Sequence, residues 1–247
     1  MGGEAMKEKL LNRVNDIAAY VAIFSLIIVL LVVSIDVNCF DKSFFHSEYE
    51  KLETGVSIGM TQKDLNKATD ILLDYLKDRR NNVDVMITLK GNEQPAFNSK
   101  EVAHMSDVKK LYQFAINLRN ICLVLFLGST AYLIFRLKKG ALTLLSIDYM
   151  KAASVFAVIF AFLGLCAYFD FDAFWTLFHE LAFRNDLWLL NPATDLMINM
   201  FPAPFFSALV FRIIAMFAGS FIVLFLLSYT YLRVRLNRLH HEVSEHV

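Results

Sequence analysis

Four long apolar blocks constrain the fold of this chain more than any other feature of its sequence. They cover residues 17–35, 121–135, 152–169 and 213–232. A helix needs about 20 apolar residues to cross the hydrocarbon of a bilayer, with a lower limit near 17, so the first and fourth blocks are long enough by themselves. The second and third are short and need their flanking residues. Hydrophobic residues make up 57% of the chain, against about 45–50% in soluble domains. We therefore predict a membrane protein with four transmembrane helices.

The charged residues predict the orientation of these helices. Lys and Arg gather after the second block, at Arg136, Lys138 and Lys139, and in the tail that begins at Arg233. Short cytoplasmic loops carry an excess of Lys and Arg, so we expect a multi-pass protein of the cell membrane with both termini in the cytoplasm. The predicted order is a cytoplasmic N-terminus (1–16), a transmembrane helix (17–35), an extracellular segment (36–117), a transmembrane helix (118–136), a cytoplasmic loop (137–151), a transmembrane helix (152–169), an extracellular segment (170–207), a transmembrane helix (208–232) and a cytoplasmic tail (233–247).

The first extracellular segment has a folding pattern of its own. Thr61 followed by Asp64 approximates a helix capping box, and apolar residues then recur at helical spacing from Leu65 to Leu76, so we expect a helix that ends near Arg80. Residues 83–87 alternate like a short strand, and Gly91 marks a turn.

Two further features complete the predicted cap. Ser99 or Ser106 is expected to cap the helix that leads into the second transmembrane block. The second extracellular segment is expected to turn back at Asn191-Pro192 as an apolar hairpin on the membrane surface. The predicted fold class is an all-α membrane protein whose four transmembrane helices carry a small α/β extracellular cap.

Two histidines flank transmembrane helices on the same predicted side of the membrane. His104 precedes the second helix and His179 follows the third. Histidine gains and loses a proton near neutral pH, so two of them at one site can serve as a general base and a general acid. Neither segment is long enough to travel far from the membrane before its histidine, so we expect the two rings within about 12 Å of each other. The alternative is two solvated loop histidines that never meet.

The run from Phe178 to Trp188 collects many chemically capable side chains at a membrane boundary, which is typical of a functional site. An interfacial belt of aromatic residues explains part of the same run. His179-Glu180 begins like the zinc motif HExxH, but Phe183 stands where that motif needs its second histidine. We therefore expect no metal.

The combination of motifs resembles the lipoprotein intramolecular transacylase family, an integral membrane family of Gram-positive bacteria. The resemblance covers nearly the whole chain and rests on four stretches in order. They are Gly59-Met60-Thr61, Leu72-Leu73-Asp74-Tyr75-Leu76, His104-Met105-Ser106-Asp107-Val108-Lys109, and Phe178-His179 through Asn185-Asp186-Leu187-Trp188.

The resemblance implies an acyltransferase that acts on a diacylglyceryl lipoprotein. The acyl chain at the glyceryl sn-2 position would move to the α-amino group of the same lipoprotein's N-terminal cysteine, which gives a lyso-form lipoprotein. The catalytic histidines of the family map to His104 and His179, and either can be the base. The residues expected to bind substrate, stabilise the oxyanion or exclude water are Asp107, Tyr112, Phe178, Arg184, Asn185 and Trp188.

The expected partners are the lipoprotein substrate and membrane lipids, with no nucleic acid and no cofactor. Two other classes of function remain open at this point. One is a non-enzymatic membrane protein whose outer cap binds a partner. The other is an intermolecular acyltransferase or lipase that acts on ordinary lipids.

Overall fold

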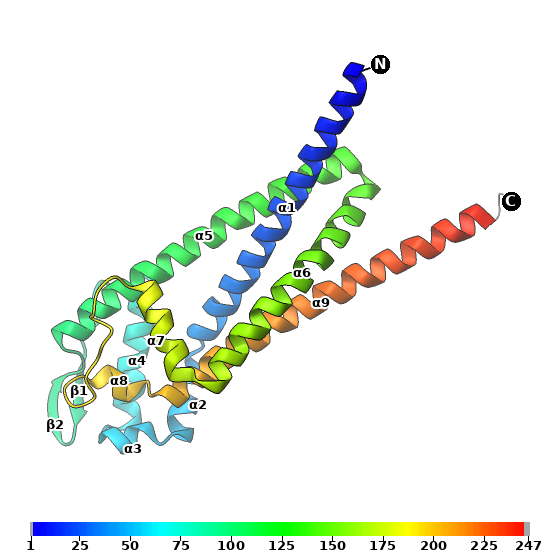
Figure 1. Cartoon of the computed structure of the whole chain (residues 1–247). Helices are drawn as coiled ribbons and strands as arrows, with labels where there is room; N and C mark the ends of the chain where they lie inside the picture. Colours follow the sequence, from blue (N-terminus) through cyan, green and yellow to red (C-terminus); the bar gives the residue numbers. More distant parts are fainter. Residues whose placement is uncertain (1, 245–247) are drawn as a thin grey trace. The chain divides into compact units, whose positions relative to one another are not determined.

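The computed structural model describes residues 2–244, and the chain is 81% helical. Within the described part, four helices are long and apolar enough to cross a membrane (Figure 1). They are α1 (Gly2–Cys39), α5 (Ser99–Leu137), α6 (Lys139–Phe169) and α9 (Ala203–Ser244). A small two-stranded sheet is the other type of regular structure. The predicted class, an all-α membrane protein with a small α/β part, is confirmed.

The long helices extend well beyond the apolar blocks, and one expected loop is wrong. Residues 137–151 were predicted as a connecting loop, but α6 begins at Lys139 and only Lys138 separates it from α5. Lys138 makes this tight connection with a left-handed φ of 49°. Ala141 and Tyr149 are buried in the part of α6 that precedes the apolar block. This part is therefore an amphipathic helix, although its average hydropathy is lower than that of the block. The sides of the membrane on which these segments lie stay a prediction.

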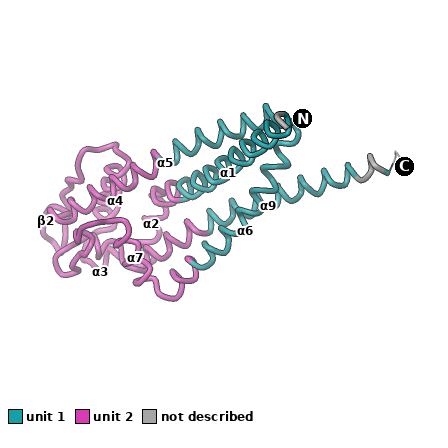
Figure 2. Tube along the Cα trace, turned by 45° about the horizontal axis from the view of Figure 1, so that its top comes forward, with its two compact units in different colours: residues 1–34, 118–162, 215–247 teal, residues 35–117, 163–214 magenta. Residues whose placement is uncertain are grey.

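The chain forms two compact units (Figure 2). The first consists of residues 1–34, 118–162 and 215–247. Its larger apolar cluster joins α1, α6 and α9 through Ile23, Ile27, Tyr149, Ala153, Phe217 and Phe221. The buried Tyr149 hydroxyl donates to the carbonyl oxygen of Phe221 at 3.2 Å, which satisfies a polar group that would otherwise be costly to bury.

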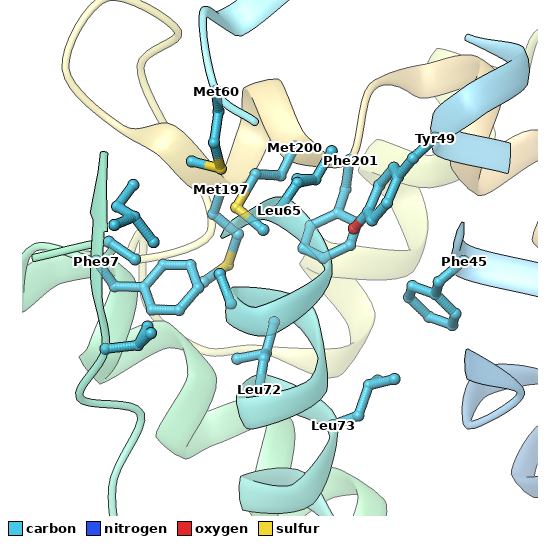
Figure 3. Packing of buried hydrophobic residues seen from close by; sticks show 14 of the residues in the cluster. Phe45, Tyr49, Met60, Leu65, Leu72, Leu73, Phe97, Met197, Met200 and Phe201 are labelled. Carbon is cyan, nitrogen blue, oxygen red and sulfur yellow. The ribbon is translucent and has the colours of Figure 1, made fainter. Parts of the chain in front are cut away.

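The second unit, residues 35–117 and 163–214, has a core of its own. It contains α2 (Lys42–Lys51), α3 (Thr54–Ile58), α4 (Gln62–Leu76), β1 (Met86–Leu89), β2 (Asn92–Pro95), α7 (Phe171–Ala182) and α8 (Leu196–Met200). Figure 3 shows its packing, in which Tyr49, Leu65 and Met200 are fully buried. The Tyr49 ring stacks on Phe205 at 5.4 Å, and its hydroxyl pairs with Thr69 at 2.8 Å. This core fixes the cap segments against one another.

The predicted helix after Thr61 is confirmed at its start and wrong at its end. The Thr61 side chain accepts a hydrogen bond from the Asp64 backbone N–H at 3.1 Å, as an N-cap does. The helix, α4, ends at Leu76 rather than near Arg80. Asp78 adopts a left-handed φ of 60° just beyond that end, a conformation that commonly terminates helices.

The predicted strand at residues 83–87 lies three residues too early, since β1 covers Met86–Leu89. Its register follows from the turn that joins it to β2. Lys90 and Gly91 both have positive φ, as a two-residue type I′ hairpin turn requires. The turn pairs Leu89 with Asn92, so pairing starts at the turn, and Val83 and Val85 are buried without forming the strand.

The helix cap expected at Ser99 or Ser106 is formed instead by Asn98. The Asn98 side chain accepts from the backbone N–H groups of Lys100 and Glu101, and Glu101 accepts from the Asn98 N–H at 2.7 Å. This reciprocal arrangement is a capping box. It starts α5 one turn before His104.

Residues 170–207 were expected to form only an apolar hairpin, but they begin with the helix α7. Asp170 caps α7 by accepting from the Ala173 N–H at 2.9 Å. The expected turn at Asn191 is confirmed, because the Asp195 N–H donates to the Asn191 carbonyl at 2.8 Å. His179 therefore lies on a helix.

Candidate active site: a buried pair of histidines

His104 on α5 and His179 on α7 lie together in the second unit. Their ring centroids are 6.1 Å apart, with an angle of 34° between the ring planes. Both are buried, with 6% and 9% of their surface exposed. The expected proximity of the two rings is confirmed, and the alternative of two solvated loop histidines is wrong.

Aromatic side chains surround the pair. Trp188 stacks on the His179 ring at 5.0 Å, while Trp175 and Phe178 meet it edge to face at 4.9 and 5.3 Å. Phe183 touches both histidines, at 5.2 Å from His104 and 5.6 Å from His179. The rings thus lie against apolar walls that displace water.

A backbone contact determines which nitrogen of His179 is free. Its Nδ1 atom is 2.8 Å from the carbonyl oxygen of Trp175. A carbonyl oxygen only accepts hydrogen bonds, so Nδ1 carries the proton and Nε2 of the neutral ring carries the lone pair. Burial lowers the pKa of His179, and the bond to Trp175 opposes that effect. The ring is therefore neutral near pH 7 and has a basic Nε2.

His104 is held neutral more strongly. It lies in the polar first part of α5, ahead of the apolar stretch that begins near Leu118. Burial, followed by the neighbouring His179, lowers the pKa of His104 to about 4, with Lys100 acting in the same direction and Asp107 against it. Its buried Nδ1 makes no hydrogen bond within the described part of the chain. A neutral imidazole with an unpaired buried nitrogen is ready to bind a polar group of a ligand.

Asp107 and Asn185 connect the two segments that carry the histidines. The Asn185 side-chain amide donates to Asp107 Oδ2 at 2.9 Å, and Lys110 donates to Oδ1 at 2.9 Å. These bonds lower the pKa of Asp107, with that to Lys110 the larger cause. Asn185 also accepts from the Leu187 N–H at 3.1 Å. The pair fixes the loop that leads to Trp188.

Glu101, which is not among the residues predicted from the sequence, joins the beginning of α5 to α8. Its side chain is 1% exposed. Oε2 accepts from the Asn98 N–H, and Oε1 accepts from the Met197 N–H of α8 at 2.6 Å. Burial is the largest cause that raises the pKa of Glu101, and these backbone bonds oppose it. Its position three residues after Asn98, as in a capping box, was the available signal.

A second buried carboxylate, Asp195, strengthens this connection. It accepts from the Asn98 amide at 2.8 Å and from the Asn191 N–H at 2.7 Å. These contacts lower its pKa, with the Asn191 bond as the largest cause. The start of α5 and the start of α8 are thus joined by two carboxylates.

Two predicted substrate-binding residues lie away from the pair. The Tyr112 hydroxyl donates to Asp36 at 2.7 Å, and its ring lies 4.6 Å from Phe40. Tyr112 is two turns beyond His104, about 12 Å along the helix axis. Arg184 is exposed, and within residues 2–244 it makes no hydrogen bond or ion pair. Phe178 and Trp188 pack against the His179 ring, whereas Asn185 bonds to Asp107, which lies three residues after His104 on α5.

No group of three or more His, Cys, Asp or Glu side chains within residues 2–244 is arranged to hold a metal ion. The site contains two neutral imidazoles, a wall of aromatic side chains and carboxylates that accept hydrogen bonds from neighbouring groups. That set is suited to proton transfer at a group held between the rings.

The fold and site describe a four-helix membrane protein with a buried histidine pair. Residues 20–206 match the family described as lipoprotein intramolecular transacylase Lit. Because the match covers most of the chain, the protein belongs to this family, whose members are acyltransferases.

Two solved structures are similar to this chain over nearly its whole length. A solved structure of the membrane-integral lipoprotein intramolecular transacylase Lit from Bacillus cereus is 20% identical, with a TM-score of 0.75, and the alignment covers 92% of this chain and 99% of that one. A variant of that protein in which one histidine is replaced by alanine is 18% identical, with a TM-score of 0.72, over 93% and 98% of the two chains. Both show the shared fold.

A curated relative is an uncharacterized protein of Aquifex aeolicus (strain VF5). It is 27% identical over 136 residues, which are 54% of this chain and 57% of the relative. The chain therefore matches little more than half the length of that relative.

Proposed function

We propose that the protein moves the sn-2 acyl chain of a diacylglyceryl lipoprotein to the α-amino group of that lipoprotein's own N-terminal cysteine. The product is a lyso-form lipoprotein. The observation that carries this proposal is the buried pair formed by His104 and His179, whose rings are 6.1 Å apart. Membership of the transacylase family indicates the class of reaction, and the histidine pair supplies the groups that general acid–base catalysis needs.

The reaction needs two proton transfers and no redox step. The amine nitrogen attacks the ester carbonyl carbon, a C–N bond forms, and the bond from the acyl carbon to the glyceryl oxygen breaks. The amine loses a proton, and the departing glyceryl oxygen gains one. The transition state closes a ring of about eight atoms, so the site must fold a flexible substrate into attack geometry.

His179 is suited to the role of base. Trp175 holds its proton on Nδ1, so Nε2 is free to accept the proton of the attacking amine. An α-amino group has a pKa of about 7.7–8.0, so this transfer has a modest cost. The proton that His179 takes is then returned to the departing glyceryl oxygen, and the neighbouring His104 ring is close enough to relay it.

The aromatic wall supports transfer to the amine over hydrolysis. Trp188, Phe178 and Phe183 pack against the histidines. Excluding water protects an ester that water would otherwise cleave. Asp107 and Asn185, which bond to each other, serve to position the substrate-facing loop, and the exposed Arg184 is available to the substrate's polar groups.

The site faces the extracellular side of the cell membrane in this proposal. Diacylglyceryl lipoproteins carry their peptide on that side, and the basic residues at Arg136, Lys138 and Lys139 favour a cytoplasmic position for the opposite end of the helices. Membrane lipids then surround the four helices and deliver the substrate laterally.

Mass spectrometry of a diacylglyceryl lipopeptide before and after incubation with the purified protein tests the proposal. The total mass should stay constant, and fragmentation should show the acyl chain on the cysteine nitrogen. A product lighter by one acyl chain would indicate a lipase. An unchanged lipopeptide would support a binding protein, and acylation only when phospholipid is added would indicate an intermolecular acyltransferase.

A further inference from the structure

Helix α7 exposes an apolar edge beside the face that buries His179. Leu177, Phe178 and Leu181 are 54%, 40% and 80% exposed. At 100° per residue these three side chains share an arc of about 100°, and His179 lies outside it. The opposite arc carries Asp172, Thr176 and Glu180, which are also exposed. The helix is therefore amphipathic, but its apolar side is only partly covered by protein.

The exposed edge continues from a membrane-spanning helix. α6 ends at Phe169 and α7 begins at Phe171, so only Asp170 lies between them (Figure 1). Tyr168 and Phe169, the last residues of α6, are 70% and 80% exposed. Large contiguous apolar patches on a protein surface mark sites of contact with membranes or partners. Because α6 is long and apolar enough to cross a membrane and ends only one residue before α7, lipid is the contact that this position favours.

We propose that α7 is an interfacial helix whose edge of Leu177, Phe178 and Leu181 is immersed in the lipid bilayer. Amphipathic helices of this kind lie in the plane of the interface and bury their apolar face about 5–10 Å into the boundary between headgroups and acyl chains. The polar arc of Asp172, Thr176 and Glu180 then faces water. Lipid covers the edge that the protein leaves exposed.

Immersion sets the depth of His179. The carbonyl ester of a membrane-borne diacylglyceryl group lies at the same boundary of headgroups and acyl chains. A histidine on the protein-facing side of α7 meets that ester without lifting the acyl chains out of the bilayer. This consequence rests on the proposed function, whereas the immersion of α7 does not.

Depth-dependent fluorescence quenching tests the immersion directly. The chain contains two tryptophans, Trp175 and Trp188, and both are replaced by phenylalanine to give a background without tryptophan fluorescence. Leu181→Trp places a probe on the apolar edge, and Thr176→Trp places a matched probe on the polar arc of the same helix. Each protein is reconstituted in vesicles of phosphatidylcholine and phosphatidylglycerol with or without brominated acyl chains.

The probe at Leu181 should emit at shorter wavelength and lose intensity in brominated vesicles, whereas the probe at Thr176 should not. Equal quenching at both positions, or none at Leu181, would overturn the proposal. Quenching of the Leu181 probe that appears only when the protein is diluted in the vesicles would instead show that a second copy covers the edge. If the double replacement fails to fold, a protein with Trp188→Phe alone serves as the probe. Its one remaining tryptophan, Trp175, should be partly quenched in brominated vesicles.

An activity measurement separates this proposal from the proposed reaction. Leu181→Glu should slow conversion of a vesicle-embedded lipopeptide, and Thr176→Glu should leave it unchanged. If the unaltered protein shows no transacylation, the proposed function fails, and the quenching result still decides whether α7 is immersed.

Discussion

The side chains of His104 and His179 are expected to act as one unit, since their rings are buried and lie 6.1 Å apart. His104→Ala and His179→Ala should each lower the transacylation rate by about 10²–10⁴, the usual contribution of a general acid or base. The double variant should be little slower than the slower single one, because groups that act together do not contribute additively.

Rates are measured by mass spectrometry with protein that remains folded and inserted. His46→Ala is the matched control, because His46 lies on α2 beside Asp70 rather than at the pair. Full activity in both single variants would remove the basis for histidine catalysis.

The pH dependence of stability should report the burial of His104. Its pKa is about 4 in the folded protein, against an ordinary value of 6.5. Between pH 6.5 and 4 the unfolded chain binds a proton that the folded chain does not, so acidification favours unfolding in this window. Above pH 6.5 this group has no such effect.

Thermal unfolding in detergent micelles, measured at pH 7.5 and at pH 4.5, gives the check. The unaltered protein should lose more stability between the two pH values than His104→Gln does. Equal losses would contradict the assignment of His104 as a buried neutral ring.

At the scale of elements, Glu101 connects the beginnings of α5 and α8. Glu101→Gln should destabilise the protein by about 2 kcal/mol, because hydrogen bonds to a charged group contribute about 1.5–3 kcal/mol and the new amide N–H faces a backbone donor. Because α5 carries His104, we also expect kcat to fall more than KM changes.

Glu93→Gln on β2 is the matched control, since Glu93 is exposed and exposed substitutions usually change stability by less than about 0.5 kcal/mol. Unfolding in micelles and steady-state kinetics are the measurements. A Glu101→Gln protein with unchanged stability and kinetics would show that the connection is dispensable.

At the scale of the whole molecule, topology decides whether the histidine pair can meet its substrate. We expect Asn92→Cys, on the exposed β-hairpin, to react with a membrane-impermeant thiol reagent added outside intact cells. Lys139→Cys, at the start of α6, should react only after permeabilisation, because positively charged ends are retained in the cytoplasm.

Cys39, Cys122 and Cys166 are replaced by serine before labelling, so that the native thiols do not contribute. The reverse pattern would put both histidines on the cytoplasmic side and would exclude an extracellular lipoprotein as the substrate.

The sequence by itself determined the features that depend on neighbouring residues. Hydropathy averaged over a span identified the four long helices, and local side-chain chemistry identified the Thr61 cap and the turn at Gly91. These predictions hold in the folded protein because each depends only on residues that are close together in the sequence.

The tertiary structure alone decided which distant residues meet. It brought His104 to His179 at 6.1 Å, placed Tyr112 against Asp36, and bound Glu101 to the start of α8. Residues close to His104 in the sequence have different contacts in the structure, because long-range packing rather than the local sequence pattern selects their partners. The same packing extended α6 beyond its apolar block and made α7 a helix where none was predicted, since an amphipathic segment becomes helical when a core is present to cover one of its faces.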